Sequence, residues 1–267
     1  AISGYGQDGP LAQRPSFDIV LQAMSGALSL NGEPGRVPTK LGLPMGDLVG
    51  GVNGPIAILS ALYERERTGK GRFIDISLMD GLQGLLGSVT SIGPRASFQH
   101  QYLVPYGTFA AADGAIVIAC LTPGFWGRIC TALGCEELTA DPRYDTLEKR
   151  RDARDEINAI VTAFTQTRTV AELVELFAAH EVPHAPILGV RDALSQPQAV
   201  HRGTVVRVEH QTLGTIPLVN RPFTFDEAMP APAAPPVLGQ HTDAVLRDVL
   251  GLDDAAIAAL RAAGAVA

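Results

Sequence analysis

Charged residues are scarce in this sequence, and their balance is acidic. Only 18% of the 267 residues are charged, and the formal net charge is −7 at pH 7. This argues against a nucleic-acid partner, because a surface that binds nucleic acid needs clustered Lys and Arg to displace counterions from phosphate. An apolar share of 46% excludes a disordered chain. No apolar run approaches the ~20 residues that cross a bilayer, and no signal-peptide pattern is found, so we expect no membrane partner.

Cysteine is scarcer still. The sequence contains three, Cys120, Cys130 and Cys135. They form no CxxC pair, so neither a disulfide framework nor a zinc site is predicted, and we expect a reducing, cytoplasmic location. A G-x-S-x-G motif is also lacking, which leaves serine hydrolase chemistry without an anchor. His180 and His184 have a metal-ligand spacing, but Pro183 between them disrupts a helix, and we predict no metal site.

Apolar periodicity predicts alternating helices and strands in the first third of the chain. Spacings of three and four predict a helix over 17–30. A second helix is predicted over 55–67, with Pro55 at its start and an apolar face directed inward. That face consists of Ile56, Leu59, Leu62 and Tyr63. Alternation in RFIDISL (72–78) predicts a strand, and a further helix is expected over 79–89.

The pattern changes after residue 94. A β-hairpin is predicted over 106–120 with Asp113-Gly114 in its loop, two short strands are predicted within 204–218, and PAPAAPP (230–236) predicts a stiff linker. Helices are expected over 123–133, 152–166 and 169–180. The sequence therefore predicts an α/β fold in three parts. These are the first part of a large domain (1–95), a small α+β domain (96–203), and a return to the large domain with C-terminal helices (204–267).

Gly4, Gly6 and Gly9 satisfy the GxGxxG pattern literally. A dinucleotide-binding fingerprint also requires a strand before the glycines and a helix that opens at their end, so that helix amides point at the pyrophosphate. Here Pro15 breaks the segment that follows. We predict a turn rather than a dinucleotide site.

Asp47 is the most informative single residue, because it is the one acidic residue in a glycine-rich apolar stretch at 41–51. Burial among such neighbours would remove solvation from the carboxylate, which then needs hydrogen-bond donors to stay charged. The flanking glycines leave backbone N–H groups unobstructed and let a substrate approach. A positioned carboxylate is a competent nucleophile toward activated acyl groups. The alternative, a helix N-cap, stays open on the residues alone.

Several segments stand out when they are taken together. They are SGYGQDGP (3–10), MGDLVGG (45–51) and RTGKGRFIDISLMD (67–80), followed by PYGTF (105–109), DPRY (141–144) and LGQHT (238–242). In this order they resemble the class III CoA-transferase family, which includes formyl-CoA transferase, carnitine CoA-transferase and the 2-methylacyl-CoA racemases. Because the resemblance extends over essentially the whole chain, it is much more specific than any single motif.

The resemblance implies a Rossmann-like large domain, here partial, a smaller α+β domain, and an interlocked homodimer. It implies an enzyme that moves CoA from an acyl-CoA to a small carboxylic acid, with coenzyme A as substrate and without a metal. By the family's mechanism, Asp47 would attack the thioester to give an acyl-aspartyl anhydride and free CoA thiolate. CoA would return to form an aspartyl-CoA thioester, from which the acceptor acid takes it.

The resemblance also places residues around Asp47. Asp18 takes the family's acidic position upstream of the nucleophile and would orient or electrostatically assist it. The position before it is a proton-moving histidine in the racemases, whereas Phe17 accepts no proton; an acyl-CoA racemase or epimerase with a displaced base is the alternative. The segment Arg14, Pro15, Ser16 and Phe17 corresponds to part of the CoA site. There Arg14 could meet a phosphate, although a simple exposed charge is equally consistent with the sequence.

The chain departs from the family in two places. QHQYL (99–103) stands where formyl-CoA transferase has a glycine-run loop, so we expect a choice of substrate other than oxalate and formate. The family also has a further N-terminal part, with the first strand and many CoA contacts, before the position of Ala1. We therefore expect a fragment, and a truncated, catalytically silent domain is the remaining alternative.

Overall fold

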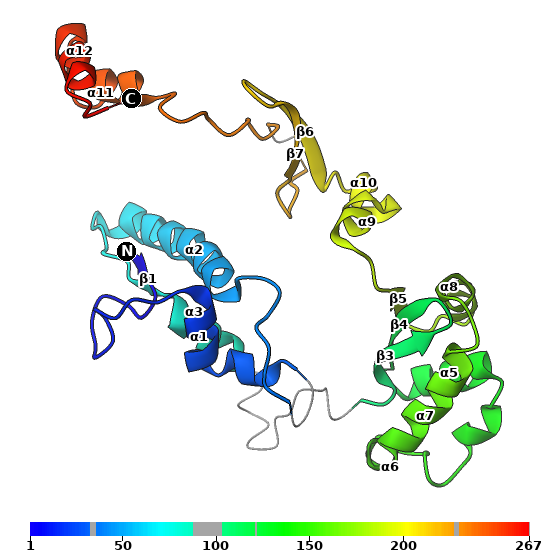
Figure 1. Cartoon of the computed structure of the whole chain (residues 1–267). Coiled ribbons are helices and arrows are strands. Elements are labelled where there is room, and N and C mark those ends of the chain that lie inside the picture. Colours follow the sequence, from blue (N-terminus) through cyan, green and yellow to red (C-terminus); the bar gives the residue numbers. More distant parts are fainter. Residues whose placement is uncertain (33–35, 88–102, 121, 227–229, 267) are drawn as a thin grey trace. The chain divides into compact units, whose positions relative to one another are not determined.

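The structure is a computed structural model that describes residues 1–32, 36–87, 103–120, 122–226 and 230–266. It divides into two compact units, Ala1–Pro186 and Ile187–Ala267 (Figure 1). Helices and strands alternate in it, and the expected α/β class is confirmed. The finer division into 1–95, 96–203 and 204–267 stays a prediction. The first boundary of this division, at residue 95, lies outside the described residues. The same holds for the end of the helix expected over 79–89 and for residues 99–102 of QHQYL.

The first unit begins with a short parallel pair of strands. Strand β1 (Ile2–Ser3) pairs with β2 (Ile76–Ser77), with Ile2 opposite Ile76. Parallel strands need a long crossover, and here helices supply it. They are α1 (Asp18–Ser25), a 3-10 helix (Ala27–Leu30) and α2 (Met45–Thr68), and α3 (Leu78–Leu85) follows β2. The helix expected over 17–30 is interrupted at Gly26, whose φ of 93° lies in the region that favours glycine.

Helix α2 begins at Met45 and not at Pro55 as expected. Pro55 lies inside the helix and removes the hydrogen bond to the Gly51 carbonyl. Both residues are exposed, so water can take up that carbonyl, and the helix continues through this position.

Three glycines, Gly46, Gly50 and Gly54, form the buried face of α2. A Cβ on Gly50 would lie 2.1 Å from Leu78 Cδ2, so glycine is what allows this helix to approach the start of α3 so closely. The apolar residues expected to face inward are on the outside instead. Ile56 is 58% exposed, Leu59 66% and Tyr63 69%, and Leu62 is also exposed. The prediction of an inward apolar face was wrong because the glycines, not the large residues, make the contact.

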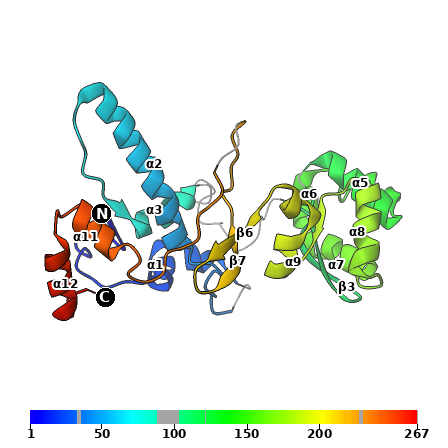
Figure 2. The same cartoon turned by 90° about the horizontal axis from the view of Figure 1, so that it is seen from above.

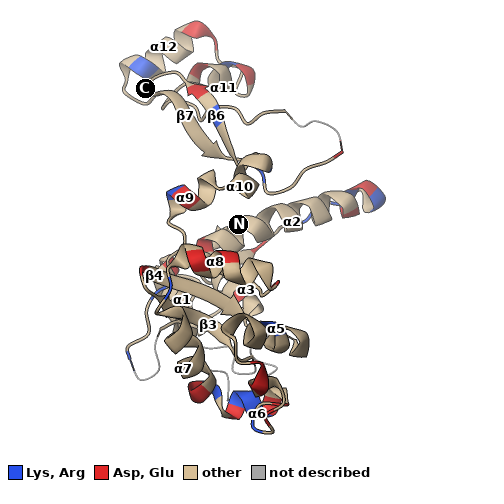
Figure 3. Ribbon diagram, turned by 90° about the vertical axis from the view of Figure 1, so that its right-hand side faces the viewer, with Lys and Arg blue, Asp and Glu red and all other residues tan. Residues whose placement is uncertain are grey.

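The C-terminal half of α2 extends beyond α1 and α3 (Figure 2), and the charges of the helix gather at that end (Figure 3). By length and composition α2 could cross a membrane: an 18-residue window has a mean hydropathy of 1.3 and is 17% buried. This corrects the expectation that no segment is long and apolar enough, because the Leu, Val and Ile residues spread along the helix keep the mean high without a continuous apolar run. Core helices of soluble proteins meet the same criteria.

Residues 103–186 contain a three-stranded antiparallel sheet covered by helices. The predicted hairpin is confirmed as β3 (Tyr106–Ala111) and β4 (Gly114–Ala119), and β5 (His184–Pro186) pairs with β4. The expected helices are present as α5 (Pro123–Leu133), α7 (Arg154–Thr165) and α8 (Val170–Ala179), with α6 (Leu147–Asp152) and a 3-10 helix (Glu136–Thr139) added. Their shared core includes Ile116, Ile118, Trp126, Tyr144 and Phe177.

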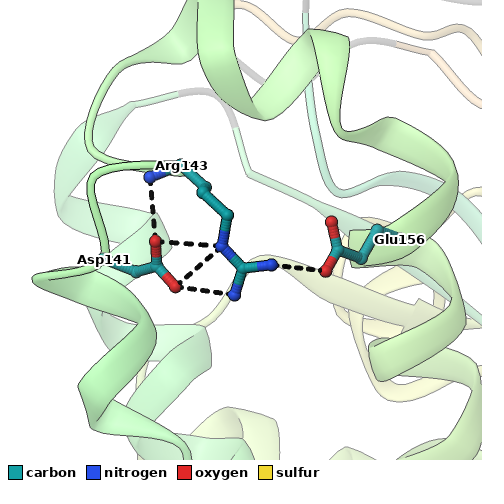
Figure 4. Close-up of polar contacts among 3 residues, drawn as sticks. All are labelled: Asp141, Arg143 and Glu156. Atoms are coloured by element: carbon teal, nitrogen blue, oxygen red, sulfur yellow. Dashed lines mark hydrogen bonds and ion pairs between the residues drawn. The ribbon is translucent and has the colours of Figure 1, made fainter.

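The DPRY motif (141–144) forms hydrogen bonds that connect two segments in this part of the chain. The Arg143 guanidinium donates to the Asp141 carboxylate at 2.8 Å and to Glu156 Oε1 at 2.9 Å (Figure 4). Hydrogen bonds from Arg143 hold the pKa of Asp141 below its ordinary value. Asp141 begins the turn before α6 and Glu156 lies on α7, so the motif ties these two segments together.

The second unit contains short elements. They are α9 (Val190–Ser195), α10 (Pro197–His201), the antiparallel strands β6 (Val205–His210) and β7 (Gly214–Val219), and the helices α11 (Thr242–Asp248) and α12 (Asp254–Ala262). The predicted pair of strands within 204–218 is confirmed. Two ion pairs, Arg261 with Asp243 and Arg247 with Asp254, join the two C-terminal helices.

Replacing Gly50 by alanine tests the close approach of α2. The new Cβ would force Leu78 out of its rotamer, and we expect Gly50→Ala to lower the free energy of unfolding by about 1–3 kcal/mol. Gly51→Ala is the matched control, because nothing lies within 4 Å of its Cβ position. There the higher helix propensity of alanine should raise stability by up to about 1 kcal/mol. Urea unfolding compares the two, and equal stability of both variants would contradict the packing described.

Candidate active site

Two of the residues singled out in the sequence, Asp18 and Asp47, come together at the first turn of α2. Asp47 lies in that turn, two residues after Met45 begins the helix. The first backbone N–H groups of a helix have no partner within it, and they carry partial positive charge. The site is therefore a helix N-terminus that presents an acidic side chain.

Asp18 supplies the hydrogen bond that caps this turn. It lies in the first turn of α1, and its Oδ1 accepts the Gly46 N–H at 2.7 Å. A Cβ on Gly46 would lie 3.0 Å from that same oxygen, so a side chain at this position would push against the carboxylate. The structure thus brings Asp18 next to the residue that precedes Asp47. The predicted proximity of the two acids has a direct structural basis.

The Asp47 side chain itself is exposed, and the expectation of a buried carboxylate held by backbone donors was wrong for this chain. The described residues offer its carboxylate no hydrogen bond or ion pair. The buried positions of the turn are those of the glycines, which face α3 and β2, and Asp47 follows Gly46 on a different side of the helix. The side chain is therefore in contact with water and open to an incoming group.

The segment from Arg14 to Phe17 leads directly into α1. Arg14 and Pro15 are exposed, and Phe17 is 81% exposed as the residue before the first turn. Ser16 is half-buried, because its hydroxyl lies over Gly4, where a Cβ would meet Ser16 Oγ at 1.9 Å. A guanidinium and an exposed aromatic ring are groups that suit a phosphate and a nucleobase, so the side chains present fit part of a nucleotide-bearing substrate.

Sequence reasoning missed Gln22. This side chain is fully buried at 0% exposure and bonds to Asp18, to the Leu41 N–H and to the Leu43 carbonyl. The available signal was a polar residue on the apolar side of a predicted helix, four residues after an acid, which is the spacing at which two helical side chains meet.

The GxGxxG segment forms the turn that was predicted. Gly6 and Gly9 have φ of 90° and 86°, and no helix opens after them. The Gln7 N–H donates to Asp75 Oδ2 at 2.8 Å, so the loop is closed by a carboxylate where a dinucleotide site would hold a phosphate.

An apolar pocket of about 220 Å³ lies beside the start of α2. Its lining residues are Ala27, Leu30, Asn31, Leu41, Met45, Leu82, Leu85 and Leu86. Met45 is part of it, whereas Asp47 is not, so the pocket borders the candidate site and leaves the carboxylate outside.

The three cysteines lack the lowered pKa that a reactive thiol requires. Burial raises the pKa of Cys120 to about 12, and it also raises the pKa of Cys130 and of Cys135. All three thiols belong to the small sheet-and-helix core, apart from α2 in the sequence. In the described part of the chain, no three His, Cys, Asp or Glu side chains lie together as metal ligands would.

Comparison with known proteins identifies the family of this chain. The model of CoA-transferase family III matches residues 1–242. The chain belongs to this family, as the resemblance in its motifs predicted.

Individual relatives give the closer likeness. The chain is 34% identical over its whole length to human succinyl-CoA:glutarate CoA-transferase, of which it covers 63%. It is 36% identical to acetyl-CoA:oxalate CoA-transferase of Acetobacter aceti, over 77% of this chain and 55% of that protein. The crystal structure of a CAIB/BAIF family protein from Brucella suis superposes with a TM-score of 0.78 at 33% identity, over 93% of this chain and 66% of that one. The chain thus spans between 55% and 66% of the length of these relatives.

The raised thiol pKa values predict slow alkylation. At about pH 8 each cysteine is protonated in the folded protein, and a thiol reacts far more slowly than a thiolate. We expect iodoacetamide to modify the native protein slowly, first at the half-buried Cys135, and all three residues rapidly after unfolding in urea. Peptide mass spectrometry over time measures the three rates separately. Fast labelling of Cys120 in the folded protein would contradict its burial.

Proposed function

We propose that this protein is a CoA-transferase that moves CoA from an acyl-CoA to a small carboxylic acid, with Asp47 as the covalent nucleophile. The observation that carries the proposal is the exposed Asp47 carboxylate in the first turn of α2, to which the described residues offer no partner, within a chain that belongs to CoA-transferase family III. A carboxylate in that state can reach a substrate without first breaking an ion pair.

The chemistry conserves one activated acyl bond at each step. A carboxylate oxygen of Asp47 attacks the thioester carbonyl, the C–S bond breaks, and CoA leaves as thiolate while an acyl-aspartyl anhydride forms. The thiolate then attacks the aspartyl carbonyl, which releases the donor acid and leaves an aspartyl-CoA thioester. The acceptor carboxylate attacks the aspartyl carbonyl of this thioester, and the C–S bond breaks. CoA leaves again as thiolate, and a second anhydride forms between the acceptor and Asp47. Attack of CoA on the acceptor's acyl carbon regenerates Asp47. Each bond broken is replaced by one of similar energy, so a difficult step is divided into easier ones.

The substrates are proposed from the relatives. The human relative is named for succinyl-CoA and glutarate, the Acetobacter relative for acetyl-CoA and oxalate, and a Chloroflexus aurantiacus relative for succinyl-CoA and D-citramalate. Their acceptors are all short acids with two carboxylates. We therefore propose a short dicarboxylic acid as acceptor, with Arg14 and Phe17 among the residues that contact CoA.

We further propose that the protein works as a homodimer in the cytoplasm. The support for an assembly is the outer side of α2, where Val52, Ile56, Leu59 and Tyr63 are exposed on one helix. An apolar surface of this kind is typical of a face that another protein segment covers. Within the family, the racemase alternative is disfavoured by Phe17, whose ring accepts no proton.

Replacing Asp47 by asparagine tests the nucleophile. With succinyl-CoA as donor and labelled glutarate as acceptor, we expect Asp47→Asn to lower the transfer rate by about 10³-fold or more, because the covalent route is lost. Hydroxylamine added during turnover should convert Asp47 of the unaltered protein to a hydroxamate that peptide mass spectrometry detects. Asp80→Asn is the control, since Asp80 is also an exposed acid in the first turn of a helix, α3. Transfer that persists in Asp47→Asn would overturn the assignment.

A panel of acceptors tests the proposed substrate class. Labelled glutarate, succinate and D-citramalate should each accept CoA at least about tenfold faster, in kcat/KM, than acetate and butyrate, because a second carboxylate adds a charge-assisted contact. Solvent deuterium incorporated at the α-carbon of an acyl-CoA without any acceptor would instead identify a racemase. Equal rates for acids with one and two carboxylates would contradict the substrate class and leave the nucleophile assignment intact.

A further inference from the structure

Gln22 is a fully buried polar side chain whose bonds all lead toward the start of α2. Its Oε1 accepts the Leu41 N–H at 3.0 Å. Its Nε2 donates to Asp18 Oδ2 at 2.5 Å and to the Leu43 carbonyl at 3.4 Å. Such a residue at 0% exposure is stable only because each of its polar atoms has a partner.

The bonds of Gln22 explain why an amide stands at this position. The Leu41 N–H requires an acceptor, and the Asp18 carboxylate requires a donor. Glutamate offers no donor when it is ionised, and leucine or methionine offers neither group. A primary amide provides both at the end of one side chain, with the reach to bridge two segments.

The two side chains together form a clamp between α1 and α2. Gln22 holds the chain at 41–43 that leads into α2, and Asp18 holds the Gly46 N–H in the first turn. Each Asp18 oxygen therefore has its own donor, one from Gln22 and one from Gly46. Without the Gln22 donor, the Asp18 carboxylate is free to rotate, and the capping bond loses its fixed direction.

We propose that Gln22 is a positioning residue for the reaction at Asp47. Asp47 directly follows Gly46, so the orientation of that peptide decides where the nucleophilic carboxylate points. This inference rests on the proposed function, and it assigns to Gln22 no contact with the substrate. Its effect is on the geometry of attack, where a displacement of about 1 Å can cost 10²-fold in rate.

Gln22→Met tests the clamp, since methionine fills a similar volume without the hydrogen bonds. In the protein at its natural length, we expect kcat for transfer from succinyl-CoA to glutarate to fall about 100-fold with KM little changed. Hydrogen exchange of the amides at 45–48 should also become faster. The matched control is Ser25→Ala, a buried residue of the same helix whose hydroxyl, within the described part of the chain, bonds to the local backbone at Gln22 and Ala27. It should leave both readouts unchanged.

A reversed pair separates the clamp from simple loss of stability. Gln22→Glu alone places two carboxylates together, and we expect both kcat and exchange protection to fall. In the double variant with Asp18→Asn, the asparagine amide donates to the glutamate while its oxygen still accepts the Gly46 N–H. The double variant should therefore be faster than the product of the two single effects by about tenfold, since residues in direct contact are not additive.

Each result decides the proposal. Unchanged exchange at 45–48 in Gln22→Met, or faster exchange with an unchanged kcat, would overturn it, and so would additive effects in the reversed pair. If the unaltered protein forms no adduct at Asp47, the proposed function fails. The positioning role then fails with it, while the exchange data still show whether the clamp itself exists.

Discussion

A hydrogen bond of 2.7 Å from the Gly46 amide to the Asp18 carboxylate joins α2 to α1 through two residues that are 28 positions apart in the chain. Helix α2 has no capping side chain of its own, because Pro44 precedes its first turn. Asp18 therefore performs from another helix the task that a local Ser or Asp usually performs. The negative charge also lies where the partial positive charge of a helix start favours it. By the positioning role proposed for this contact, it sets the direction in which the Asp47 side chain points from the helix.

Glycines make two close contacts of α2 possible, one with α1 and one with α3. Gly46 leaves room for the Asp18 oxygen, and Gly50 leaves room for Leu78, so α2 rests on α1 and α3 through its backbone. A helix that packs in this way has its large apolar residues on the opposite side. The exposed Val52, Ile56 and Leu59 are thus a consequence of the same packing that holds the candidate site together.

The sequence predicted what local patterns determine. Turn residues and alternation were sufficient to predict the hairpin β3–β4, and the spacing of apolar residues was sufficient to predict α5 and α8. Each of these elements is specified by residues close together in the chain. The start of α2 was missed because Pro55 is a strong local signal for a helix start, whereas the cap comes from Asp18, far away in sequence. Asp47 was singled out as the one acidic residue of a glycine-rich apolar stretch, and the family resemblance added its expected role. Its exposure was not predicted, since the burial of a residue in a glycine-rich helix depends on which face the neighbouring elements cover.

The position of two acids at one helix start bears on the proposed chemistry. A helix N-terminus carries about half a positive charge, which suits one carboxylate better than two. Asp18 accepts the Gly46 N–H at this helix start, and the Asp47 side chain is exposed to water. Conversion of Asp47 to an anhydride or thioester removes one of the two negative charges from the turn. If Asp47 is acylated as proposed, the Asp18 carboxylate stays bonded to the Gly46 amide. Asp18 would then hold the turn in place during acyl transfer without touching the substrate.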